Sequence, residues 1–395
     1  MKLSARELNR ATLARQLLLE REHMPVEEAV RRVVALQAQQ PASPYLALWN
    51  RLAAFEPAEL DAAFAGRRVV KATLMRITLH AVHADDYPVL RAAMQPVLHA
   101  SRLGSRFAAS GLTPAEGHQL ALRIADFATE ARTTAELRGW LGEQLGPKRA
   151  DAAWWGMSGY APLHRAPAEA APWSFGARSL FRAAALDPVP VGREVDEPAL
   201  RTLLLRYLAG FGPASVADMA QFTLLPKTPI RAALRALAGE LAELQGPDNA
   251  AYFDLPDAPR PPADTPAPPR LMAMWDSTLL AYADRPQAHR AGAAPGRLIP
   301  PDYRRVVIRA NGDVLPTLLV DGHVAGVWRP LPTGIEATAF HPLPPATWQA
   351  LTQEAQSLAP LLAARDRTPY SRFDHWWPKL PKLPEGETRM LFDGR

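Results

Sequence analysis

The spacing of apolar residues predicts helices along most of the first 220 residues. Between residues 26 and 37, apolar side chains recur at steps of three and four, which is the period of one helix face. An earlier helix opens with Ser4 and Glu7, whose spacing is typical of a capping box. Two further helices are expected at 44–52 and 57–66, so the chain begins as an α-helical protein.

Short β-rich runs then interrupt the helical pattern. Residues 69–75 and 78–84 have the length of the two arms of a hairpin. A winged helix consists of helices followed by a basic two-stranded hairpin, and this order occurs twice more. Helix candidates at 113–128, 133–144 and 151–166 precede a possible wing at 173–184, and helices at 197–212, 215–223 and 227–239 precede strands within 241–255. The sequence therefore predicts three tandem modules.

The last third of the chain has a different pattern. A proline-rich stretch at 256–270 is expected to be a linker. Alternating strands with turns at Asn311-Gly312-Asp313 and Asp321-Gly322 follow within 303–329 and predict a small barrel or sandwich. A late helix is expected at 345–363. The predicted units are 1–100, 101–190, 191–258 and 259–395.

Composition and charge narrow the possible functions. The 395 residues include no cysteine, which excludes disulfides, thiolate metal ligands and a thiol nucleophile. A net charge of +5 and a sequence pI near 9.6 permit nucleic-acid binding without establishing it. The charged N-terminus has no signal-peptide pattern and no apolar run is long enough to span a membrane, so we expect a soluble cytoplasmic protein.

Motifs for several kinds of chemistry are missing from the sequence. There is no phosphate-binding GxxxxGK[ST] loop, which argues against an ATPase, and no GxSxG nucleophile motif. His80 and His83, with Asp85-Asp86 after them, resemble a metal cluster, but residues three apart in a strand point to opposite faces. We therefore expect neither a metal nor a cofactor.

Glutamines at the end of the second predicted helix are the most informative polar residues. Gln37 continues the apolar stripe inward, and an unpaired buried amide costs roughly 1–3 kcal/mol. Pro41 biases Gln40 away from helix, so the helix is expected to end near residues 38–40. If the end is extended, Gln37 and Gln39 share a face and point to one place. Two interpretations remain open: the amides brace the loop at 40–45, or they act on a substrate.

Several segments together resemble the AlkZ/YcaQ family of winged-helix DNA glycosylases. The matching stretches are Gln37-Ala38-Gln39 and residues 74–87, 211–222, 271–285 and 311–329. The resemblance implies a mainly α fold with β structure, in which three tandem winged helices and a C-terminal β-barrel form a C-shaped DNA-binding surface. The family's catalytic signature, Gln, an aliphatic residue and then Gln or Asp, falls on Gln37 and Gln39. Where the family pattern has a small residue, this chain has Ile77.

The resemblance also implies a reaction and a partner. A guanine alkylated at N7 is cationic and leaves as a neutral base, so two glutamines that position water suffice without a strong acid. We expect a monomeric, monofunctional DNA glycosylase that acts on double-stranded DNA containing alkylated purines, associated with the nucleoid. Bulky natural-product adducts or crosslinks, removed in self-resistance, are the expected substrates. The expected DNA contacts are Arg76, His80, Arg178, Arg290 and Arg297.

Two other classes of protein compete with this hypothesis. Winged helices serve mostly in regulators that bind DNA without catalysis, and a fold alone does not give function. A regulator has no need of the Gln37 and Gln39 pair. The other alternative is a drug-binding resistance protein in which the Trp- and Tyr-rich segment 154–175 forms an apolar pocket. Such a protein binds free ligand without DNA.

Overall fold

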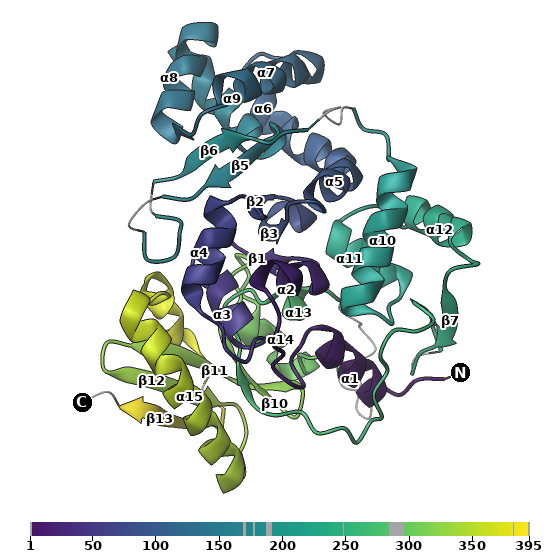
Figure 1. Cartoon of the computed structure of the whole chain (residues 1–395), viewed down its shortest axis with the longest axis vertical. Helices are drawn as coiled ribbons and strands as arrows, with labels where there is room; N and C mark the ends of the chain where they lie inside the picture. The colour runs from purple at the N-terminus through teal and green to yellow at the C-terminus, as the bar shows by residue number, and fades with distance from the viewer. Residues whose placement is uncertain are drawn as a thin grey trace.

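The first hundred residues form the centre of the molecule in the computed structural model (Figure 1). The structure describes residues 2–168, 171–176, 178–186, 192–247, 249–283, 296–381 and 383–393. The first elements are α1 (Ala5–Arg15), α2 (Val26–Arg32), β1 (Leu36–Gln37), α3 (Ser43–Trp49), α4 (Pro57–Ala65), β2 (Val69–Thr73), the 3₁₀ turn η1 (Met75–Ile77), β3 (Leu79–His83) and α5 (Tyr87–Arg102). The Ser4 and Glu7 capping box at the start of α1 is confirmed.

The predicted helix through Gln37 is wrong in its second half. Helix α2 ends at Arg32, and Val34 takes a left-handed conformation with φ of 74°. Leu36 and Gln37 then pair with β3 as strand β1. The apolar stripe is real, but its last part is buried by a strand partner some forty residues away, which helical periodicity does not encode.

The two predicted wings of the first half join in one antiparallel sheet. The second unit contains α6 (Ser105–Ala108), α7 (Pro114–Phe127), β4 (Arg132–Thr133), α8 (Thr134–Leu145), α9 (Pro147–Tyr160), β5 (Leu163–Ala166) and β6 (Leu180–Ala183). The strand order β1-β3-β2-β5-β6-β4 links the two units through a single pair, Lys71 with Arg165. The segment expected to be one helix at 151–166 is therefore a helix and a strand, because Leu163–Ala166 pairs with β6.

The third unit lies beside α5 and α1. It contains α10 (Glu197–Phe211), α11 (Val216–Thr223), α12 (Lys227–Ala236), β7 (Ala242–Gln245) and β8 (Ala251–Asp254). Helix α10 packs against both α5 and α1. Helices followed by a two-stranded hairpin recur here as the sequence predicted.

The C-terminal unit is an open antiparallel sheet in the part of the chain that the structure describes. Its elements are β9 (Arg270–Leu271), α13 (Ser277–Leu280), α14 (Pro301–Val307), β10 (Thr317–Val320), β11 (His323–Leu331), β12 (Gly334–Ala339), α15 (Pro345–Arg365), the 3₁₀ segment η3 (Ser371–Lys379) and β13 (Glu387–Asp393). The sheet runs β13-β12-β11-β10-β9, with β13 and β9 as its edges. Helix α15 contacts both edge strands, so a helix covers the sheet where a closed barrel was predicted.

Two further predictions for this region need correction. The run 303–308 begins in helix α14 and not in a strand, with Pro300 and Pro301 at the helix start. The proline-rich stretch 256–270 is not a free linker. It lies along α1, where Arg6 Nε donates to the carbonyl of Ala263 at 2.6 Å and Arg10 Nε donates to that of Thr265 at 2.7 Å.

Buried ion pairs connect the units. Arg15 in α1 pairs with Asp254 at 2.6 Å, and Arg51 pairs with Asp276 at 2.9 Å, with both pairs almost fully buried. Arg10, also in α1, pairs with Asp321 before β11. One apolar core runs from Leu13 to Leu391, so the units share their interior. Among the described residues, no helix combines the length and apolar character needed to cross a lipid bilayer.

Candidate active site

The two signature glutamines lie on and just after strand β1. Gln37 pairs with His80 across the antiparallel ladder, and the Ala38 amide donates to the Leu79 carbonyl at 2.8 Å. Ser277 of α13 holds the other side of the strand. Its hydroxyl accepts from the Gln37 amide at 3.1 Å and donates to the Ala35 carbonyl at 2.8 Å. The backbone of the signature is therefore fixed from both sides.

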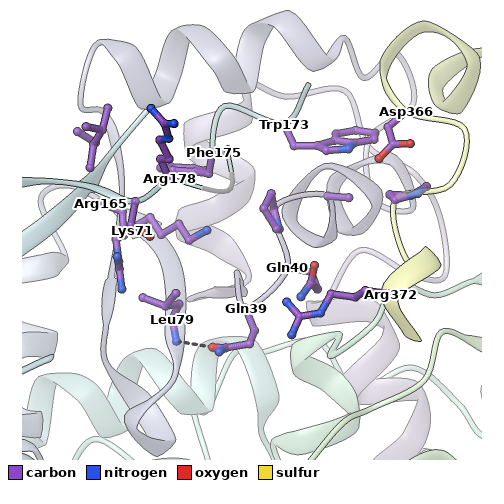
Figure 2. Close-up of a pocket in the computed structure, with 17 residues that line it drawn as sticks. Gln39, Gln40, Lys71, Leu79, Arg165, Trp173, Phe175, Arg178, Asp366 and Arg372 are labelled. Atoms are coloured by element: carbon purple, nitrogen blue, oxygen red, sulfur yellow. Dashed lines mark hydrogen bonds between the residues drawn. The ribbon is translucent and has the colours of Figure 1, made fainter. Parts of the chain in front are cut away.

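The side-chain amides of both glutamines are anchored on consecutive residues of the neighbouring segment. The Gln37 carboxamide contacts the hydroxyl of Thr78 through Nε2 at 3.2 Å and through Oε1 at 3.3 Å. Gln39 Oε1 accepts from the Leu79 amide at 3.3 Å, as Figure 2 shows. These are long hydrogen bonds, which a stronger partner can replace. The described contacts of the two amides lie at Thr78 and Leu79 and not in the loop at 40–45.

The two amides differ in exposure. Gln37 is 3% exposed, whereas Gln39 is an exposed residue. No hydrogen bond between Gln39 Nε2 and any described residue accompanies the Oε1 contact, so this amide faces solvent. A buried, oriented carboxamide beside an accessible one is an arrangement suited to holding a water molecule.

A left-handed turn places Thr78. Within η1, Arg76 has φ of 52° and Ile77 has φ of 60°. Side chains rarely adopt this conformation, and a β-branched residue does so least readily. The small residue that the family pattern has at the position of Ile77 is explained by this backbone, because glycine adopts a positive φ without strain.

Arg76 and His80 lie behind the glutamine strand. His80 is fully buried, with Nδ1 3.1 Å from the Thr78 carbonyl and Nε2 3.3 Å from the Arg76 guanidinium. Since a carbonyl only accepts and a guanidinium only donates, Nδ1 carries the proton. Burial, together with the charge of Arg76, lowers the pKa of His80 to about 3, so the imidazole is neutral at physiological pH. Arg76 also lies over the Phe222 ring at 5.5 Å. These contacts support the site, and DNA binding by either residue stays a prediction.

A pocket of about 400 Å³ opens beside Gln39. Its polar lining comes from five separate segments of the chain and consists of Gln39, Gln40, Lys71, Arg165, Arg178, Ser179, Asp366 and Arg372. Trp173 and Phe175 supply aromatic surface. Figure 2 shows Lys71 pointing into the space between Arg178 and Gln39, with Arg372 on the opposite side. The predicted residues Gln39 and Arg178 are thus brought together.

Sequence reasoning missed Lys71, Arg165 and Arg372. Lys71 is 4% exposed, and its ammonium lies 4.2 Å from the centre of the Phe175 ring. Burial and the nearby charge of Arg165 lower the pKa of Lys71 to about 7. The sequence held one sign of the role of Lys71: it is a charged residue inside the apolar run 69–75, where a strand is expected to be buried.

The other predicted DNA contacts lie elsewhere. Arg297 donates to the Thr12 hydroxyl and to the Pro213 carbonyl, both at 2.8 Å, and stacks on Tyr282 at 4.5 Å. These contacts occupy its guanidinium inside the molecule. Arg290 lies outside the described residues. The part of the chain that the structure describes contains no group of three or more side chains placed to hold a metal ion.

The Trp- and Tyr-rich segment mostly fills the core. Trp154 is 8% exposed and packs edge-on against Phe181, and Tyr160 is 2% exposed. Of the aromatic side chains in this segment, Trp173 and Phe175 line the pocket beside Gln39. Trp154 and Tyr160 are therefore part of the packed interior.

Comparisons with known proteins give a matching family, a curated relative and a similar solved structure. The model of the family described as DNA glycosylase AlkZ-like matches residues 30–361. A curated relative, the interstrand DNA cross-link repair glycosylase of Streptomyces sahachiroi, is 25% identical over 386 residues, which span 91% of this chain and 96% of that protein. The solved structure of the Streptomyces sahachiroi DNA glycosylase AlkZ has a TM-score of 0.73 at 22% identity. That likeness covers 93% of this chain and 98% of that chain, and it shows a shared mixed α/β fold.

Proposed function

Because the chain belongs to the AlkZ-like family of DNA glycosylases, we propose that it hydrolyses the N-glycosidic bond of cationic N7-alkylguanine, with Gln37 and Gln39 positioning the water. The observation that carries this proposal is the pair of carboxamides on Thr78 and Leu79, one buried and one open to the pocket. Thr78 and Leu79 come about forty residues after the glutamines, so the fold is needed to bring these contacts together.

The chemistry matches the weak basicity of an amide. The bond from C1′ to the base breaks, and its electron pair neutralises the positive charge on the purine. Water adds to C1′, and its proton passes to solvent. Gln37 and Gln39 orient the water and turn carbonyl oxygens toward the developing oxocarbenium charge. No imidazolium takes part, because His80 is neutral. We therefore expect labile cationic purines to be released and neutral lesions such as uracil to be left intact.

The substrate proposal extends to bulky lesions. The name of the curated relative states that it repairs interstrand crosslinks, and we propose that this chain removes bulky natural-product adducts or crosslinks in self-resistance. The open pocket beside Gln39 supports this, since a large adduct does not fit a closed base pocket. The helical units, each followed by a hairpin, act in this proposal as winged-helix modules of a monomer that lines a C-shaped DNA surface in the nucleoid.

Base release from duplex DNA containing N7-alkylguanine tests the proposal. The wild type should release base well above spontaneous depurination. Gln37→Ala and Gln39→Ala should each reduce release by roughly 100-fold, the usual effect of removing one group that stabilises the transition-state charge. Gln353→Ala, which changes an exposed glutamine of α15, is the matched control and should keep full activity.

DNA binding must be measured with the same proteins. Release that is lost in the two variants while binding persists supports catalysis by the amides. Intact DNA binding with no release from small or bulky adducts by the wild type contradicts the proposal and leaves a non-catalytic DNA-binding protein.

A further inference from the structure

The pocket beside Gln39 has an excess of positive charge. Lys71, Arg165, Arg178 and Arg372 line it, and Asp366 is the single carboxylate among the lining residues. None of these four cations makes an ion pair or a hydrogen bond with a described residue. Elsewhere in the described structure, the buried cations Arg10, Arg15 and Arg51 all pair with an aspartate. Arg270 pairs with Glu354, and Arg91, which pairs with no described carboxylate, donates to the Gln95 side chain and the Tyr160 carbonyl. The pocket cations differ because the described residues give them no polar partner of either kind.

The arrangement of the cations is held by aromatic rings and by the sheet. Lys71 and Arg165 are directly opposite each other on β2 and β5. Phe175 covers the Lys71 ammonium, and Phe181 lies 3.9 Å from the Arg165 guanidinium. Arg178 and Arg372 are exposed at the rim. Lys71 and Arg165 are desolvated and have no described polar partner, which is unfavourable, so their retention beside two exposed arginines points to an anion that completes the group.

We propose that this pocket binds one phosphodiester of the damaged DNA strand, next to the glycosidic bond that Gln39 faces. This inference rests on the proposed function, because Gln39 fixes which part of the strand lies beside the pocket. A phosphate accepts several charge-assisted hydrogen bonds at once, from guanidinium and ammonium groups alike. Lys71 would form the floor of the site, with Arg178 and Arg372 closing on the phosphate from the rim.

Occupation of the pocket also matters for the reaction. The transition state carries positive charge at C1′, and four unpaired cations nearby would oppose it. A bound phosphate neutralises part of this charge before the bond breaks. Binding of the strand then also favours the chemical step, which explains why a cationic pocket lies next to the glutamines.

Substitution of single phosphates tests the proposal on the full-length protein. Duplexes that contain N7-alkylguanine would carry one uncharged methylphosphonate, placed in turn at each phosphate near the lesion. For the wild type we expect one position at which affinity falls about tenfold, the size of one lost charged contact. For Lys71→Gln, and for the rim variant Arg178→Gln with Arg372→Gln, this position should have no further effect. Lys227→Gln, an exposed lysine of α12, should keep the wild-type pattern.

The salt dependence of DNA binding gives a second readout. Each lost phosphate contact should reduce the slope of log affinity against log salt by about one. The rim variant changes only exposed side chains, so it keeps the test valid if Lys71→Gln fails to fold. Equal slopes for wild type and variants, or a methylphosphonate profile without a sensitive position, would overturn the proposal.

A free anion is the other source of the same chemistry. If inorganic phosphate raises the melting temperature of the wild type but not of the rim variant, while the methylphosphonate profile is flat, the pocket holds a free anion and the proposal is wrong. The two proposals fail separately. A wild type that binds DNA with one sensitive phosphate but releases no base refutes the glycosylase mechanism and keeps the phosphate site.

Discussion

Replacing Lys71 with methionine should stabilise the protein while weakening its hold on DNA. Burial and the charge of Arg165 lower the pKa of Lys71 from 10.5 to about 7. A pKa difference of one corresponds to about 1.4 kcal/mol, so keeping the charged ammonium at this place costs on the order of 5 kcal/mol. Relaxation of the strand and entry of water reduce this cost. Methionine has a similar length and no charge, and we expect a gain of about 1–3 kcal/mol in the free energy of unfolding at pH 7.

The pH dependence of this gain has a definite sign. The pKa of Lys71 is lower in the folded protein than in the unfolded chain, so the unfolded chain binds more protons between about pH 7 and 10.5. The lysine therefore destabilises the fold fully below about pH 7, and its effect fades as the pH rises toward 10.5. The advantage of Lys71→Met should be largest at pH 6 and clearly smaller at pH 9.

Urea unfolding of wild type and Lys71→Met at pH 6, 7.5 and 9 measures this advantage. Lys227→Met, at an exposed position of α12, serves as the matched control and should show no such trend. The reasoning would be refuted if Lys71→Met were less stable than wild type at pH 6, or if the difference stayed constant up to pH 9. In either case the ammonium would have a compensating partner in the folded protein.

Three further predictions concern the support of the site. Ser277→Ala leaves the backbone N–H of Gln37 and the carbonyl of Ala35 without a partner, so it should cost roughly 1–3 kcal/mol of stability. It should also lower base release at saturating DNA, and unchanged release would mean that Ser277 does not position β1. Asp276→Ala leaves Arg51 buried and unpaired, and chemical denaturation should show a loss of about 3–5 kcal/mol, a prediction that fails if the loss stays below 1 kcal/mol. Because the pKa of His80 is lowered to about 3, His80 should give no inflection near pH 6.5 in the rate of base release at saturating DNA. Lys71→Met removes the lysine whose pKa is about 7, so a clear inflection near pH 6.5 in that variant would contradict the neutral imidazole.

The local parts of the fold could be predicted from sequence. The Ser4 and Glu7 capping box and the hairpin of β2 and β3 depend on neighbouring residues, and both are present. The end of α2 could not be predicted, because Leu36 and Gln37 satisfy a helical stripe and a strand equally well. Their choice is made by β3, which lies far along the chain.

Some residues of the candidate site could likewise be chosen from sequence, and others could not. Gln37 and Gln39 carry a family signature, so they could be chosen as candidates from sequence alone, and their catalytic role stays a prediction. Lys71 lies near Gln39 because distant segments of the chain form one pocket. A single lysine in a predicted strand does not indicate such a pocket. Arg297 illustrates the opposite error: it follows a flexible-looking Gly- and Ala-rich stretch, yet Thr12, at the other end of the chain, accepts its hydrogen bond.

The buried arginines of α1 depend on aspartates that are synthesised much later than the helix. Arg10 lies in α1, but its partner Asp321 is 311 residues later in the chain. At translation rates of about 5–20 residues per second, Asp321 is made on the order of 15–60 s after Arg10. During that time the side of α1 that carries Arg10 is uncovered, and the nascent protein presents a basic helix without this acidic partner. Synthesis of the C-terminal sheet thus supplies the last acidic partner of α1, after α10 and Asp254 have covered the other side of the helix.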